Sequence, residues 1–352
     1  MNFKNHTPFS AFAWENHDNN KQTYITSVCR IKLTISYKKD NELLELKLDK
    51  NQGDLFDKDI FFDDSNEKEL RYSTDYIPFK PMADIIINAN SYSKIALPMW
   101  SCGVKVFSQS NKMILEKNLI VSGQRNWIKK PIVGWELENP TKCDKVPLRY
   151  SLAYGGEITK DEEIISSYPY NPIGIGLVDK NHPSHIIKAP QIYEAKLPIN
   201  PDVPYEILSY EGFGNIDRSW EDRFVFGGTY DDNWIKNQSP FLPLDFDYRF
   251  YQTSHPDMRL KEYIQPFTTV VLENLLPNAS IAKIIIPPYT PISKTTTNTQ
   301  ENISSMNLDT LLIDIDSQNP NDWCIYLSYR SRIKFDEDVI SSEIFLETSR
   351  DS

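Results

Sequence analysis

The sequence predicts a mostly β protein, with an antiparallel, sandwich-like N-terminal unit and a larger, irregular β-rich unit. Two observations lead to this expectation. Several segments alternate apolar and polar residues, which is the period of a strand with one buried face. No strong amphipathic helix interrupts these segments before Gly123, and a series of short strands is typical of a sandwich or a barrel.

The length of the chain predicts the division into two units. At 352 residues the chain exceeds the roughly 250 to 300 residues at which a single hydrophobic core stops growing. Proline becomes frequent from Trp127 onward, and proline suits loops and bends better than central strands. We therefore expect an antiparallel β unit over residues 1–125 and an irregular β-rich unit over residues 126–352.

The clearest strand pattern runs from Tyr24 to Tyr37, where apolar and polar residues alternate. Cys29 falls on the apolar face, so we interpret it as a small core residue and not as a reactive thiol. Residues 44–48 repeat the alternation, which predicts a second strand and a hairpin through Lys38 to Asn41. The simplest architecture is an antiparallel sheet with one face in water.

Further strands are expected later in the chain, where β-branched and apolar residues gather between turns. They cover residues 83–89, 104–107, 115–121, 267–275, 281–286, 310–315 and 323–333. The tract from Thr290 to Asn307 is polar, so we expect a flexible loop there. The acidic tail beyond Phe335 is expected to be a short helix or a frayed end.

Between Gly212 and Phe250 the chain is rich in aromatic residues, with arginines and acidic residues interleaved. Glycine and proline recur too often for a long helix, because glycine costs about 1 kcal/mol and proline about 3 kcal/mol in a helix interior. Aromatic side chains bury a large area per rotatable bond and can therefore hold loops in one shape. We expect irregular, tightly packed structure, and the simplest interpretation is a loop-rich part of the core.

Charge and cysteine usage limit the classes of partner and compartment. The net charge of −11 repels phosphate backbones, which argues against generic binding of nucleic acid or anionic membranes and favours a basic partner. The 4 cysteines lie far apart without a CxxC motif, as expected for reduced thiols and not for a zinc site. The first residues lack the pattern of a signal peptide, and no apolar run approaches a membrane span. We therefore expect a cytoplasmic protein.

Asp245 and Asp247 are the candidates for catalysis. Two residues apart in a strand, their carboxylates would lie on one face about 7 Å apart, and aromatic platforms beside carboxylates are used to bind sugars. A carbohydrate-active hydrolase is therefore the alternative function, whereas a structural ion pair with Arg249 is the simpler interpretation. His182 and His185 flank a proline that prevents helical ligand spacing, so no metal site is predicted. Neither a serine-nucleophile motif nor a nucleotide-binding glycine loop is present, so we expect no cofactor.

A series of weaker motifs runs along nearly the whole chain. They are STDYIPFKPMADIIINA at residues 73–89, VSGQRNW at 121–127, PLRYSLAYGG at 147–156, NPIGIG at 171–176, GFGNIDRSWEDR at 212–223, GTYDDNW at 228–234, PFLPLDFDYRFYQTSHPDMR at 240–259, LENLLP at 272–277 and LDTLLIDID at 308–316. In this order they resemble the family of type VI secretion effector adaptors that was long catalogued as a domain of unknown function. Residues 133–145 and 252–256 depart from the family pattern, which leaves the identity of the cargo open.

The resemblance implies a non-catalytic adaptor or chaperone in the cytoplasm of a Gram-negative bacterium. Such a protein binds a toxin effector, possibly one with a PAAR spike-tip domain, and assists its loading onto the secretion spike. Because interfaces draw their energy from a few aromatic and arginine residues, Trp220, Arg223 and Trp234 are the predicted partner-binding residues. Burial in the core is the alternative for both tryptophans. A third possibility is a structural component that leaves the cell with the spike.

Overall fold

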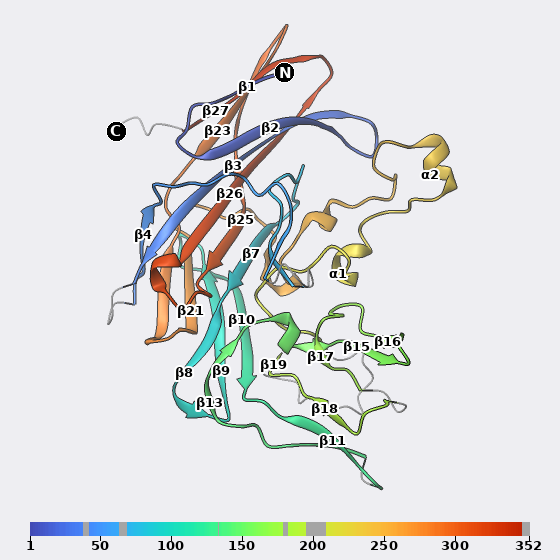
Figure 1. Ribbon diagram of the computed structural model, residues 1–352. Helices are drawn as coiled ribbons and strands as arrows, with labels where there is room; N and C mark the ends of the chain where they lie inside the picture. Colours follow the sequence, from blue (N-terminus) through green and yellow to red (C-terminus); the bar gives the residue numbers. More distant parts are fainter. Residues whose placement is uncertain (38–41, 63–68, 133, 179–181, 195–208, 347–352) are drawn as a thin grey trace.

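The computed structural model describes residues 1–37, 42–62, 69–132, 134–178, 182–194 and 209–346 (Figure 1). It confirms the mostly β fold class. The largest sheet has seven strands in the order β2, β3, β26, β25, β7 and β20, with β4 paired to β3. Their bounds are β2 Ser10–His17, β3 Thr23–Ser36, β4 Glu45–Leu48, β7 Ala83–Asn88, β20 Arg259–Leu260, β25 Asn307–Asp314 and β26 Cys324–Phe335.

This sheet combines strands from both ends of the chain. The first and last long strands, β3 and β26, pair along their whole length, and β25 lies parallel to β7 while its other neighbour is antiparallel. Strands from residues 1–125 and from residues 126–352 are therefore interleaved in one sheet. The sheets do not divide the chain at residue 125, because strands that are distant in the sequence pair within the same sheet.

A second sheet of five antiparallel strands covers one face of the first. Its order is β19, β10, β9, β21 and β22. The bounds are β9 Met99–Phe107, β10 Met113–Ser122, β19 Ile192–Glu194, β21 Thr269–Leu276 and β22 Ala279–Ile285. Alternate residues of both sheets, such as Ile31 and Leu33 of β3 and Val104 and Val106 of β9, belong to one hydrophobic cluster. This shared core is that of a sandwich, which was predicted for residues 1–125 and is instead built from strands of both parts of the chain. Cys29 lies in this core as expected.

The opposite face of the seven-stranded sheet is also covered, which corrects the expectation of one face in water. Arg30 of β3 is only 2% exposed, and its guanidinium donates to Asp75 over 2.6 Å. Residues 54–62 and 69–80 and the aromatic stretch pack over this face. The alternation at β3 indicated its inward face correctly, but pairing with acidic residues allowed arginine to be buried on the other face.

A third sheet has four strands and includes two segments that were predicted to be irregular. Its order is β1 Asn2–Asn5, β27 Val339–Leu346, β23 Pro291–Thr297 and β24 Glu301–Ser305. The flexible loop expected at residues 290–307 is thus wrong, and so is the helix or frayed end expected after Phe335. Serine and threonine occupy the inward positions of β23, and Ser293 contacts Ser331 through their hydroxyls at 2.7 Å. Because serine and threonine replace apolar residues at its inward positions, the hydropathy pattern did not indicate a strand here.

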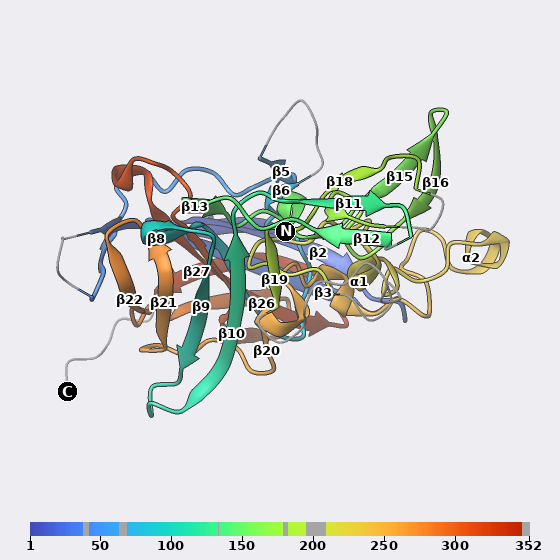
Figure 2. The same cartoon turned by 90° about the horizontal axis from the view of Figure 1, so that it is seen from below.

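Smaller pairs of strands surround the three sheets (Figures 1 and 2). They are β5 Ile60–Phe61 with β6 Leu70–Tyr72, β8 Asn90–Leu97 with β13 Cys143–Pro147, β14 Tyr154–Gly155 with β17 Ile175–Gly176, β15 Glu157–Lys160 with β16 Glu163–Ser167, and β11 Asn126–Lys130 between β12 Gly134–Leu137 and β18 Ile186–Lys188. Gly155 has φ 146°, and a Cβ there would lie 2.1 Å from the carbonyl oxygen of Asn171. Only glycine fits this bend.

The nine strand segments predicted from the sequence, which lie within residues 24–333, all contain strands. The hairpin connection proposed at Lys38 to Asn41 lies outside the described residues, although β3 and β4 do pair antiparallel. The aromatic stretch from Gly212 to Phe250 is irregular, as predicted. Within it lie two short helices, α1 Glu221–Phe224 and α2 Asp232–Asn237. Short 3-10 turns lie at Tyr150–Leu152, Tyr248–Tyr251, Pro256–Met258 and Pro320–Asp322.

Candidate partner-binding surface

Trp220, one of the three predicted partner-binding residues, lies in the interior. Its side chain is 2% exposed. The ring meets Tyr150 and Tyr210 edge to face, with centroids 5.3 and 5.9 Å apart, in a second hydrophobic cluster. Edge-to-face pairs of this kind stabilise a packed core beyond the area they bury. Trp220 thus anchors the start of α1 to the body of the protein.

Arg223 is also buried, at 3% exposure. Its Nε donates to the carbonyl of Phe250 over 3.0 Å and one terminal nitrogen donates to the carbonyl of Ile216 over 2.7 Å. Burial lowers the pKa of the Arg223 guanidinium to about 10, which leaves it charged at neutral pH. The side chain therefore joins the two ends of the aromatic stretch. A direct contact of Trp220 or Arg223 with a partner remains a prediction that their burial does not favour.

Trp234 lies on α2 and is partly exposed. Asp231 caps the helix by accepting a hydrogen bond from the backbone nitrogen of Trp234 over 2.8 Å. The indole Nε1 donates to the carbonyl of Phe241 over 2.9 Å, and Tyr230 packs edge to face with the ring at 4.7 Å. Of the three predicted residues, Trp234 alone holds a position at the surface.

Large apolar side chains stand exposed around these anchors, and the sequence did not distinguish them from core residues. They are Phe224 at 65%, Val225 at 54%, Tyr230 at 57%, Ile235 at 61% and Leu244 at 68% exposed. We call these five residues the apolar surface. In both views α2 lies at the outer edge of the molecule, away from the sheets (Figures 1 and 2). Ile235 lies on α2 and Tyr230 shortly before it, whereas Phe224 and Val225 lie at the end of α1. Exposed apolar residues on an outlying element are typical of a protein interaction site.

The backbone beneath the apolar surface is fixed by hydrogen bonds. Asp245 accepts from the backbone nitrogen of Thr229 over 3.0 Å and from its hydroxyl over 2.7 Å. Gln238 donates to the carbonyls of Asn19 and Leu242 over 2.7 and 2.8 Å, which ties α2 to the turn between β2 and β3. The apolar surface is therefore presented by loops with defined structure.

Asp245 and Asp247 do not have the geometry assumed for a catalytic pair. Neither lies in a strand: Asp245 is in a turn, and Asp247 caps the 3-10 helix that begins at Tyr248. Asp247 accepts from the guanidinium of Arg249 over 2.9 and 2.7 Å. Hydrogen bonds from Thr229 lower the pKa of Asp245, and the bond from Arg249 lowers that of Asp247. A general acid needs a raised pKa, so both carboxyls fit structural roles better.

A buried network under the aromatic stretch joins two of the sequence motifs. Asp84, from the motif at residues 73–89, is fully buried and accepts hydrogen bonds from Lys80 Nζ over 2.7 Å and from the Ser254 hydroxyl over 2.6 Å. Gln252 Nε2 and the backbone nitrogen of Thr253 also donate to it, over 2.9 and 3.0 Å. Burial alone would raise the pKa of Asp84, but Lys80 and Arg259 outweigh it and lower the pKa to about 2. Hydrogen bonds to Asp84 thus connect the motif at residues 73–89 with the motif at residues 240–259.

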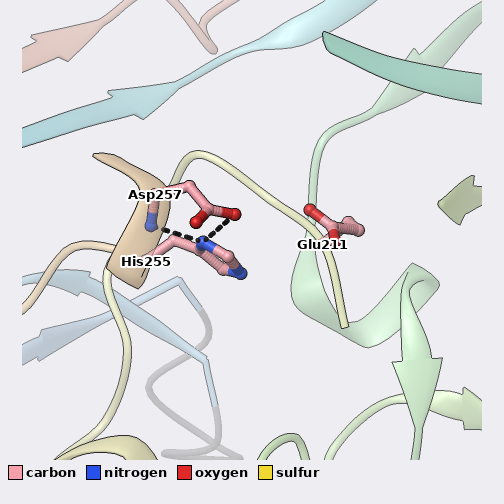
Figure 3. A group of neighbouring side chains, drawn as sticks. All are labelled: Glu211, His255 and Asp257. Atoms are coloured by element: carbon pink, nitrogen blue, oxygen red, sulfur yellow. Dashed lines mark hydrogen bonds and ion pairs between the residues drawn. The ribbon is translucent and has the colours of Figure 1, made fainter. Parts of the chain in front are cut away.

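A second cluster, which the sequence reasoning missed, contains three potential metal ligands: Glu211 and His255, which are buried, and Asp257, which is exposed (Figure 3). The ammonium of Lys117, from β10, lies among them. Its Nζ is 2.7 Å from Glu211 Oε2, 2.8 Å from His255 Nδ1 and 3.3 Å from Asp257 Oδ2. An ammonium has three donors, and these three acceptors satisfy them. Lys117 thus takes the position that a bound cation would need.

The contacts of His255 define its charge and tautomer. Nε2 lies 3.2 Å from the carbonyl oxygen of Tyr210, so Nε2 carries the proton, and Nδ1 accepts from Lys117 and from the backbone nitrogen of Asp257. Burial, and then the positive charge of Lys117, lower the pKa of His255 well below its usual value. His255 is therefore neutral and completes the buried lysine site.

The remaining candidate residues have structural surroundings. His182 packs against Trp135 at 6.2 Å, and His185 is exposed. All four cysteines are free, and burial raises the pKa of both Cys29 and Cys102 to about 12. A helix must be long and apolar to cross a membrane, and none of the helices in the described ranges meets that requirement.

Comparison with known proteins finds one family. The profile described as "Uncharacterized protein conserved in bacteria (DUF2169)" matches residues 20–321, which is most of the chain. No curated protein and no solved structure gives a match.

Proposed function

The chain belongs to the bacterial family DUF2169, and we propose that it is a non-catalytic adaptor or chaperone for a type VI secretion effector. In this proposal it binds the effector in the cytoplasm of a Gram-negative bacterium and assists its loading onto the secretion spike. The effector is expected to carry, or to act with, a PAAR spike-tip domain. The ordered motif series along the chain is the basis for naming the secretion system.

The apolar surface is the observation that carries the binding role. Five large apolar side chains are more than half exposed within residues 224–244. Hot spots of interfaces are enriched in aromatic residues and are surrounded by polar groups. Tyr230 and Phe224 are of that type. The exposed residues Asp231 and Asp232 follow Tyr230 in the chain, and Asp245 follows Leu244.

The charge of these surroundings indicates the chemistry of the partner. A segment that presents apolar side chains flanked by lysine or arginine would complement the apolar surface and its neighbouring carboxylates. The net charge of −11 for the whole chain favours the approach of such a segment over longer distances, and this attraction weakens with salt.

The supported loops also fit an adaptor role. Arg223, Asp245 and Gln238 fix the backbone around the apolar surface through hydrogen bonds. A surface that is ordered before binding loses less conformational entropy when the partner docks. Asp245 was also a candidate for catalysis, and its carboxylate is already engaged in hydrogen bonds with Thr229.

The test is complex formation with effectors from the same genome. We expect the full chain, co-expressed with an effector that carries a PAAR domain, to form a stable complex in size-exclusion chromatography with light scattering. Ile235→Asp and Leu244→Asp should weaken the complex at least tenfold while leaving the fold intact. Ile164→Asp, at a site on β16 that is 57% exposed, is the matched control and should bind normally.

Two results would contradict the proposal. A folded chain that forms no complex with any effector of the secretion system would remove its basis. Equal loss of binding in Ile164→Asp and Ile235→Asp would show that the apolar surface is not the contact. Recovery of the protein in culture medium, together with the spike, would favour the alternative of a structural component that is exported.

A further inference from the structure

A partly enclosed pocket of about 610 Å³ is lined by residues of the small strands and of the segments that connect them. Its walls come from the start of β11, from residues 138–141, from the 3-10 turn at Ser151 and Leu152, and from the ends of β17 and β18, which meet at the lower right of Figure 1. Pockets of roughly 300 to 1,000 Å³ are of the size that holds small molecules and chain ends.

Arg125 lines this pocket, and one of its side-chain nitrogens has no hydrogen-bond acceptor in the described part of the chain. Its Nε is shielded from solvent and has no hydrogen-bond acceptor among the residues that the structure describes. The guanidinium lies over the ring of Tyr193, with 5.4 Å to the centroid, and the carbonyl of Arg125 accepts from the backbone nitrogen of Ala189 over 3.0 Å. The side chain is thus positioned by an aromatic ring and by its backbone, while its Nε donor has no acceptor among the described residues.

The charges of the lining residues leave an excess of positive charge. Lys188 also lines the pocket and forms no ion pair within the described ranges. The one acidic lining residue, Glu138, is engaged elsewhere: its Oε2 accepts from the backbone nitrogen of Asn126 over 3.1 Å and from Asn126 Nδ2 over 2.8 Å. Two cations therefore face the pocket with one carboxylate that is already hydrogen-bonded, in a chain whose net charge is −11.

We propose that this pocket binds a carboxylate group through Arg125, with Lys188 as a second cation. A guanidinium offers a planar pair of N–H donors that matches a carboxylate, and it is more weakly hydrated than an ammonium, which suits a shielded position. The amides of Gln124 and Asn139 line the same pocket and can bond the polar groups next to that carboxylate. A peptide C-terminus and a small dicarboxylic acid share this chemistry. This inference does not depend on the adaptor function.

Calorimetric titration of the full chain tests the proposal with two pairs of probes. The first pair is acetyl-trialanine with a free C-terminus and the same peptide as its C-terminal amide, and the second is succinate and succinamide. We expect binding of at least one carboxylate probe and none of its amide. Tighter binding of the peptide identifies a chain end as the ligand, and tighter binding of succinate identifies a free organic acid.

Variants assign the binding to the pocket. Arg125→Gln should weaken binding of the carboxylate probe at least tenfold, and Arg125→Lys, which keeps the charge but loses the planar fork, should also weaken it. Lys188→Gln should reduce affinity several-fold. Lys160→Gln on the exposed β15 hairpin removes the same charge outside the pocket and should have no effect.

The proposal is overturned if neither carboxylate probe binds the folded chain. It is equally overturned if Arg125→Gln, with an unchanged circular dichroism spectrum, binds as tightly as the unmodified chain. If Arg125→Gln does not fold, Arg125→Lys and Lys188→Gln decide the outcome, and unchanged binding in both contradicts the assignment.

Discussion

The ammonium of Lys117 lies 2.8 Å from Nδ1 of His255, so a buried lysine is held by a neutral histidine. The two residues are 138 positions apart. Lys117 occupies an inward position of β10 between Leu115 and Leu119, which both belong to the main core. The carboxylate of Glu211 balances its charge there, and His255 accepts a hydrogen bond from it. Both residues connect the five-stranded sheet to the segments that frame the aromatic stretch.

The lowered pKa of His255 predicts that the folded protein loses stability in mild acid. Its pKa is lowered in the folded chain, so the unfolded chain binds more protons below about pH 6.5 and stability falls as the pH falls. The stability gained from neutral His255 is fully present above about pH 6.5. Between pH 7.5 and 5.5 we expect this residue to lower the free energy of unfolding by an amount on the order of 1 kcal/mol.

Urea unfolding at the two pH values measures this decrease. His255→Gln keeps a neutral acceptor for Lys117 and should lose the contribution, so its stability should change less between pH 7.5 and 5.5. Glu211, Asp257 and Arg259 surround His255 in both proteins, and their effects cancel in the comparison. Identical pH dependence in the variant and the unmodified chain would show that His255 is protonated in the folded state.

Lys117→Met should destabilise the protein strongly. The substitution leaves the carboxylate of Glu211, which is 4% exposed, without its positive partner, and breaking a buried pair costs about 3 to 5 kcal/mol. The double variant Lys117→Met with Glu211→Gln removes both charges and should recover most of the loss. The free energy of unfolding from urea titration is the measurement.

Lys105 provides the control for that substitution. Its Nζ is 2.6 Å from Glu273 on the outer side of the same sheet, and both side chains are 29% exposed. Lys105→Met should cost less than about 1 kcal/mol, because partly solvated pairs contribute little. Comparable losses for Lys105→Met and Lys117→Met would contradict the assigned role of the buried cluster.

Substitution of Trp220 should mainly affect stability, whereas substitution of Trp234 should mainly affect effector binding. Trp220→Ala removes a ring that is 2% exposed and should lower the free energy of unfolding by about 3 to 5 kcal/mol. Trp234→Ala removes a partly exposed ring and one hydrogen bond, so about 1 to 2 kcal/mol is expected, together with weaker effector binding. Urea titration and light scattering of the complex measure the two effects. Normal effector binding by Trp234→Ala would remove it from the interface.

Asp245→Asn and Asp247→Asn test the hydrolase alternative. Both carboxyls have lowered pKa values and are ionised at neutral pH, so neither can donate a proton to a leaving group. We expect no release of reducing sugar from glycan substrates by the unmodified chain or by either variant, and normal effector binding by Asp247→Asn. Glycan hydrolysis that Asp245→Asn abolishes would favour the enzyme.

Alternation of apolar and polar residues predicted the sheets well, because one face of a strand must be buried wherever sheets pack. The strand at Thr23–Ser36 and the paired strands later in the chain follow this rule. The pattern failed at Pro291–Thr297, where serine and threonine face inward. Hydropathy cannot detect a strand whose buried positions are occupied mainly by serine and threonine.

The sequence by itself determined the fold class and the irregular character of the aromatic stretch, because these follow from periodicity and from glycine and proline placement. Only the tertiary structure decided that Trp220 and Arg223 are buried while Ile235 and Leu244 are exposed. It also brought Lys117 to His255 and left Nε of Arg125 without a hydrogen-bond acceptor among the described residues. Composition is local, whereas burial and charge pairing depend on which distant segments pack together.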